Sequence, residues 1–199
     1  KTLLYLPAMM ERIGDYGMWN FGAYHQTYNP ELDSAHLHRH WKGFHHGGHR
    51  WPWLNFARSG NPEVFDFAEA HSRHLMDVSV CNWEDPAYNE KHWDDGTWWG
   101  HNMTLKYKGG LCRYKGLVHW YAGMRMFYNS AADFALWHYY LTGYRRAWDV
   151  AMDMGEFLLR ANQMVDDPDT HRVYSMRNGM SRGNMAITLY HATHDERYL

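Results

Sequence analysis

The sequence of 199 residues has little cysteine and no long apolar stretch. Its two cysteines, Cys81 and Cys112, are too few for a disulfide framework, although the sequence leaves one bridge between them open. No hydrophobic run approaches the roughly 20 residues of a transmembrane helix, so we expect no membrane partner. The net charge of -2 gives no overall basic field, so we also expect no nucleic-acid partner.

The chain also lacks an initiating methionine and a recognisable signal peptide. Its last residues, 196–199, continue a pattern typical of an amphipathic helix. We therefore interpret both ends as cuts through a larger protein. The remaining domains of that polypeptide are expected partners of this chain.

Aromatic residues are abundant, with 11 Trp and 15 Tyr. A large aromatic core would account for them, and so would a protein that stacks Trp and Tyr rings on sugar faces.

Three segments align around a small-residue turn: 53–60, 136–143 and 186–194. Gly60 and Gly143 end the first two and supply the left-handed position after a helix, and Pro62 suits the first turn of the next helix. The second helices carry apolar residues at helical spacing, namely Phe65, Ala68, Leu75 and Met76 in one, and Trp148, Ala151, Met152, Phe157 and Leu158 in the other. In the third copy Leu199 aligns with Phe65 and Trp148, and Asn129-Ser130 is a candidate N-cap before Ala131.

Repeated helical hairpins with unequal insertions predict an all-α fold, in which antiparallel hairpins form part of an (α/α) toroid that is incomplete in this fragment. Residues 1–30 would be a lead-in from an absent upstream domain, and 31–199 the partial toroid. An irregular helical domain is the alternative.

The short turns (58–62, 142–145 and 193–195) should lie at one end of the hairpins, and the long connections (34–51, 81–129 and 166–184) at the other. Function concentrates on long loops that a rigid scaffold holds. Three stretches without Asp or Glu overlap these connections and contain Arg39, Lys42, Arg50 and Arg58; Lys106, Lys108, Arg113, Lys115 and Arg125; and Arg172, Arg177 and Arg182. The carboxylates fall mostly on the second helices. The pattern predicts a basic rim that attracts an anionic ligand, and chance segregation of charge is the alternative.

Sixteen histidines admit three interpretations. The spacing of His36 and His40 would place two imidazoles on one helix face, which allows a divalent metal at this His-rich segment, although no complete metal motif is present. Many histidines will be structural. Others can move protons, because imidazole titrates near neutral pH.

Cleavage of a uronic-acid polymer by β-elimination needs a group that neutralises the carboxylate, a base and an acid. Arg, Asn, His and Tyr suit these roles, and the acid-free stretches contain them. A glycosidase needs two carboxylates, and Glu31, Asp94 and Asp95 only flank those stretches. This favours a lyase over a glycoside hydrolase or a non-catalytic anionic-glycan-binding module.

The segments 67–78, His119-Trp120 and 139–143 resemble the toroid domain of the exo-rhamnogalacturonan lyase-like proteins and the related ulvan lyases. The likeness runs from about residue 12 onward. It implies a secreted or periplasmic polysaccharide lyase that acts on an acidic polysaccharide. Where that family often has an acidic Asn-x-Glu-Tyr-Asp-like segment, this chain has residues 29–33 followed by the His-rich run.

We predict that the active site is built on 96–129, with help from 45–51 and 177–182. His119 is the expected base, with His101 and His46 as further candidates. Arg113 and Asn102 would neutralise the uronate, and Tyr114 would be the acid. The residues expected to contact the sugars are Trp120, Tyr121, Arg50, Trp51, Arg177 and Arg182.

Overall fold

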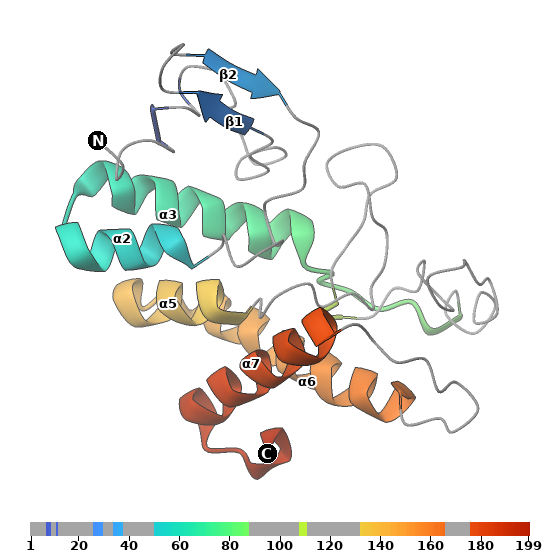
Figure 1. Cartoon of the computed structure of the whole chain (residues 1–199). Coiled ribbons are helices and arrows are strands. Elements are labelled where there is room, and N and C mark those ends of the chain that lie inside the picture. Colours follow the sequence, from blue (N-terminus) through green and yellow to red (C-terminus); the bar gives the residue numbers. More distant parts are fainter. Residues whose placement is uncertain are drawn as a thin grey trace.

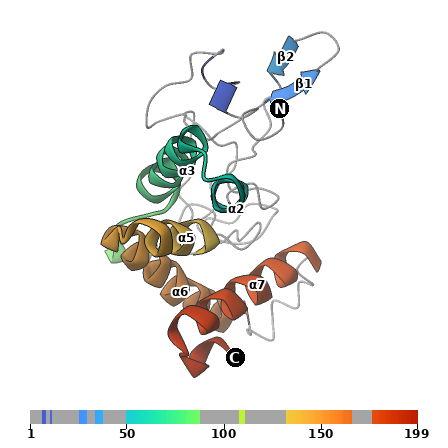
Figure 2. The same cartoon turned by 90° about the vertical axis from the view of Figure 1, so that its left-hand side faces the viewer.

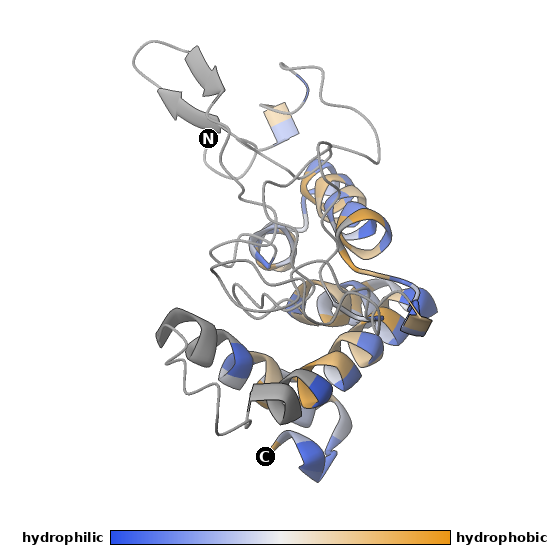
Figure 3. Ribbon diagram, turned by 90° about the vertical axis from the view of Figure 1, so that its right-hand side faces the viewer, coloured by the Kyte–Doolittle hydropathy of each residue, from blue (hydrophilic) through white to orange (hydrophobic). Residues whose placement is uncertain are grey.

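The computed structural model describes residues 7–8, 11, 26–29, 34–37, 50–87, 108–110, 132–165 and 176–199. Helices make up most of this part, which confirms the all-α prediction apart from one short pair of strands. Figures 1 and 2 show two tiers: α2 and α3 form one, and α6 and α7 the other, with α5 between them. The helices carry both apolar and polar residues, visible as mixed colours in Figure 3, and apolar residues of α5, α6 and α7 meet in the core.

The first hairpin consists of α2 (Trp51–Ser59) and α3 (Pro62–His74), and α3 continues into one π-helical turn, η2 (Leu75–Ser79). Asn61 caps α3, because its side chain accepts a hydrogen bond from the Glu63 amide at 2.8 Å. Three of the four predicted apolar positions of α3 and η2, Ala68, Leu75 and Met76, are buried, together with Trp53, Val64 and Phe67. The fourth, Phe65, is half-buried and its ring contacts Trp53 and Phe56.

The second hairpin consists of α5 (Ala132–Thr142) and α6 (Arg145–Val165), and α7 (Met176–Thr193) packs against both. The predicted core residues of α6 are buried or packed against the core, with Ala151 and Leu158 fully buried and Phe157 nearly so. The candidate cap at Asn129-Ser130 lies outside the described residues.

The three turns after α2, α5 and α7 have the same hydrogen bonds. The residue after each helix has positive φ: 62° at Gly60, 71° at Gly143 and 57° at His194. The hydroxyl of the preceding residue donates back to the carbonyl four residues earlier, and accepts from the amide two residues later, at Ser59, Thr142 and Thr193. The internal repeat predicted from the sequence is therefore a repeat of one local structure.

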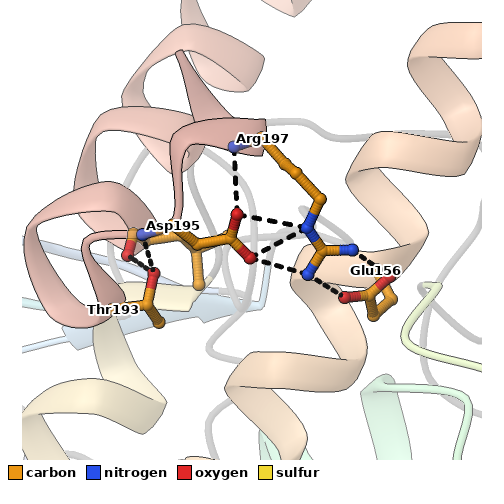
Figure 4. A network of polar contacts seen from close by, with 5 residues as sticks. Glu156, Thr193, Asp195 and Arg197 are labelled. Carbon is orange, nitrogen blue, oxygen red and sulfur yellow. Dashed lines mark hydrogen bonds and ion pairs between the residues drawn. The ribbon is translucent and has the colours of Figure 1, made fainter.

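The third turn leads into a 3-10 turn instead of a second long helix. Asp195 caps this single turn, η4 (Glu196–Tyr198), and also pairs with Arg197, which reaches Glu156 of α6 (Figure 4). Tyr198 is 7% exposed, whereas Leu199 is 84% exposed. The alignment of Leu199 with the half-buried Phe65 and Trp148 positions was therefore wrong, because a 3-10 turn places Tyr198 and not Leu199 against α6.

The strands β1 (Gln26–Asn29) and β2 (Ser34–Leu37) form an antiparallel pair in which Thr27 lies opposite His36. His36 therefore lies on a strand. The idea that His36 and His40 share a helix face is wrong on this point, because side chains alternate between faces along a strand.

The helix ends separate only in part as predicted, because the α5–α6 turn lies against the end of α3: the Arg73 guanidinium is 4.7 Å from the centre of the Tyr144 ring, and Arg146 pairs with Asp77 of η2 at 2.7 Å. In Figure 1 the α2–α3 turn and the end of α7 lie on the left, and the ends of α3 and α6 and the start of α7 lie on the right. We call the right-hand side, from which the long connections leave, the connection end. Arg58 is in the last turn of α2 beside Gly60, so its assignment to the basic rim was wrong.

Candidate functional site

Most of the predicted site residues lie outside the described residues. This applies to the whole proposed catalytic set and to several sugar contacts, namely His119, His101, His46, Arg113, Tyr114, Asn102, Trp120 and Tyr121. Their assignment stays a prediction. Arg177 lies on α7, where only the backbone is described.

Arg50 and Trp51 begin α2 at the connection end. Arg50 is the N-cap residue, and its carbonyl accepts the Leu54 amide at 3.1 Å. The next residue, Trp51, is 55% exposed, whereas Pro52 and Trp53 turn into the protein and are buried. The start of α2 thus has an arginine followed in sequence by an exposed tryptophan. A cation beside an exposed aromatic ring is a combination that can bind a charged sugar.

Asp133, which the sequence analysis missed, lies opposite Arg50. It is in the first turn of α5 and is 5% exposed. Its Oδ2 lies 3.6 Å from a guanidinium nitrogen of Arg50, and Thr188 of α7 also acts on the pKa of its carboxyl. Burial raises the pKa of the Asp133 carboxyl, and the hydrogen bond from Thr188 and the charge of Arg50 oppose that shift.

One sequence signal pointed to Asp133. It is the first acid after the acid-free stretch that runs from residue 96 to 132. The contact between Asp133 and Arg50 depends on how α2, α5 and α7 pack together, and the sequence alone does not give that packing.

Arg182 is half-buried on α7, six positions before Thr188 and nearer the connection end. The structure thus places Arg50, Trp51 and Arg182 in the half of the molecule that the sequence predicted. It does not place Lys108 there as a free cation, because the Lys108 ammonium pairs with Asp153 in the middle of α6 at 2.8 Å.

The cations of the second helices are engaged with carboxylates. Guanidinium–carboxylate distances of 2.7–3.1 Å join Arg73 to Glu69, Arg145 to Asp149, Arg146 to Asp77, Arg160 to Glu84, and Arg197 to Glu156 and Asp195. The predicted concentration of acids on the second helices is therefore real, and these acids are largely matched by local arginines.

Three histidines are fully buried between the helices of the first hairpin and α5, and they are structural. His71 stacks on Phe67 with ring centroids 5.9 Å apart, and His74 lies at the end of α3. His138 packs between Trp53 and Tyr144, at 5.1 and 5.2 Å. Burial lowers the pKa of His138 to about 4, so its ring is neutral near pH 7.

Within the described ranges, no group of three or more His, Cys, Asp or Glu side chains is arranged to hold a metal ion. The described part of the chain also has no helix with the length and apolarity needed to cross a membrane.

Comparison with known proteins adds a distant likeness. No family model and no solved structure matches the chain. The chain is 26% identical over 163 residues to a Bacillus subtilis (strain 168) protein named "Uncharacterized protein YetA". The match covers 77% of this chain and 16% of that protein, so the chain spans only a small part of the relative's length.

Proposed function

We propose that this chain is part of an (α/α) toroid in a secreted or periplasmic polysaccharide lyase that cleaves an acidic polysaccharide by β-elimination. The observation that supports it is the start of α2, where Arg50 and the exposed Trp51 lie in one acid-free stretch and Arg50 is 3.6 Å from Asp133, the first acid after another.

The reaction suits that set of residues. His119 would take the C5 proton of a uronate whose carboxylate is neutralised by Arg113 and Asn102. The electron pair of the broken C–H bond forms a double bond between C4 and C5, and the C4–O bond breaks. Tyr114 would protonate the departing sugar oxygen. Arg50, Arg177 and Arg182 would bind neighbouring acidic sugars, and Trp51, Trp120 and Tyr121 would stack on them.

The test is incubation of the protein with ulvan, rhamnogalacturonan and a glycosaminoglycan, monitored by the ultraviolet absorbance of the conjugated uronate product. We expect absorbance from at least one polymer, its loss in His119→Ala, and its retention in His191→Ala, the matched control at the exposed end of α7. Binding of the polymer should survive in His119→Ala and should weaken with added salt, because the attraction is between charges.

The other outcomes separate the alternatives. New reducing ends without the absorbance would identify a glycoside hydrolase. Binding without either product would identify a glycan-binding module. An active His119→Ala variant would move the base to another residue.

A further inference from the structure

The Arg50–Asp133 pair differs from the other ion pairs of the described chain. The arginines of α3 and α6 and Arg197 form hydrogen-bonded contacts of 3.1 Å or less with carboxylates. The separation at Arg50 is 3.6 Å, which is longer than an ordinary hydrogen bond, and its side chain keeps 42% of its surface exposed. Arg50 therefore lies near a carboxylate, and no residue of the described part of the chain makes a closer contact with its N–H donors.

Asp133 is the fixed partner of the pair. Its side chain is 7% exposed and lies in the first turn of α5, and Thr188 of α7 acts on the pKa of its carboxyl. Its Oδ1 is buried and has no hydrogen-bond partner among the described residues. Among those residues, Arg50 is the charged group that acts on this carboxyl. A buried carboxyl with an unused acceptor is costly, which calls for a role beyond packing.

We propose that Asp133 is a positioning residue that holds the Arg50 guanidinium beside the exposed Trp51, where it receives the carboxylate of an acidic sugar. This rests on the proposed function. Asp133 does not touch the sugar, because its carboxyl is buried. It restricts Arg50 before the ligand arrives and thereby reduces the entropy that binding would otherwise cost.

The geometry predicts a pattern of affinities for oligogalacturonate, chosen as the uronate probe. Asp133→Asn removes the charge and keeps the shape, and should weaken binding about tenfold, which is the cost of immobilising one long side chain. In catalysis the same change should raise KM and leave kcat unchanged. Arg50→Gln should weaken binding at least as much, and the double variant should lose no more than Arg50→Gln alone, because both changes remove one interaction. Additive losses, or a fall in kcat with KM unchanged, would overturn the proposal.

A second measurement does not depend on the function. Phenylglyoxal modifies exposed guanidinium groups, and mass spectrometry gives the ratio of adduct at Arg50 to adduct at Arg58, the exposed arginine at the other end of α2. This ratio should rise several-fold in Asp133→Asn. An unchanged ratio would show that Asp133 does not hold Arg50.

Thr188→Val provides the same test if Asp133→Asn does not fold. It removes the hydroxyl next to the carboxyl and changes no charge, so the adduct ratio should rise by a smaller factor, and no rise would overturn the proposal. If the ratio rises but the unaltered protein neither binds nor cleaves any uronate polymer, the proposed function fails while the positioning role of Asp133 stands.

Discussion

His138 should make the protein sensitive to acid. Its imidazole is 0% exposed between Trp53 and Tyr144, and neither ring nitrogen has a hydrogen-bond partner within the described part of the chain. Desolvation is the main cause that lowers its pKa from 6.5 to about 4, with a smaller lowering from Arg73 that Glu69 opposes.

The direction in which stability changes with pH follows from proton binding at His138. Between pH 6.5 and about 4 the unfolded chain binds a proton at this residue and the folded protein does not. The neutral ring therefore contributes its full share of stability above pH 6.5, and that share falls as the pH drops towards 4. At about 1.4 kcal/mol per pKa unit, the loss is about 3 kcal/mol once the pH is below the folded-state pKa.

The perturbation is His138→Leu, which has similar volume and does not titrate. Urea unfolding should give a stability near pH 8 within about 1.5 kcal/mol of the unaltered protein, since core substitutions that conserve volume cost little. Between about pH 8 and pH 4 the unaltered protein should lose about 3 kcal/mol more than the variant does, because the other titrating groups are common to both. His191→Leu, at an exposed position of α7, is the control for replacing a histidine outside the core. Equal losses in the unaltered protein and in His138→Leu would refute the assignment.

Further predictions concern packing and backbone. Gly143→Ala should destabilise the second hairpin by about 1 kcal/mol, and His194→Gly should stabilise the third turn by a similar amount, because both positions have positive φ; thermal melting checks both. Ser72→Ala should cost about 1–3 kcal/mol in urea unfolding, since it leaves the buried Trp53 indole N–H without its 2.7 Å acceptor, and Trp53→Phe in the same protein should make that change nearly neutral. Gly155→Ala should push the Tyr198 side chain of η4 away from α6, because the added Cβ would overlap the Tyr198 hydroxyl. Faster hydrogen exchange at residues 196–199 would reveal this displacement.

The repeated turns were predictable because the signal is local. A glycine after an amphipathic helix supplies the positive φ that other residues avoid, and Gly60 and Gly143 do so here. His194 was found only by alignment with them. The hydroxyl before each of these positions makes two hydrogen bonds within the same turn, so the repeat survives where the glycine does not.

Burial of polar residues was not predictable in the same way. His138 comes after Leu136 and Trp137 in a strongly apolar helix, and nothing in that spacing distinguishes a buried histidine from one that faces solvent. The burial depends on α2, which brings Trp53 against the ring. Arg58 shows the converse, because it lies in an acid-free stretch of sequence and yet its helix carries it to the short-turn end.

Asp133 bears on the choice between elimination and hydrolysis. The preference for a lyase depended on acids that flank the basic stretches, and Asp133 is such a flanking acid that nevertheless reaches the connection end. A glycosidase would need it as one of two accessible carboxyl groups, separated by about 5–9.5 Å. Asp133 is buried, lies 3.6 Å from Arg50, and has no other acidic group of the described chain acting on its pKa. Its position supports a role behind the substrate site, and so the preference for elimination does not depend on the absence of acids from this end of the molecule.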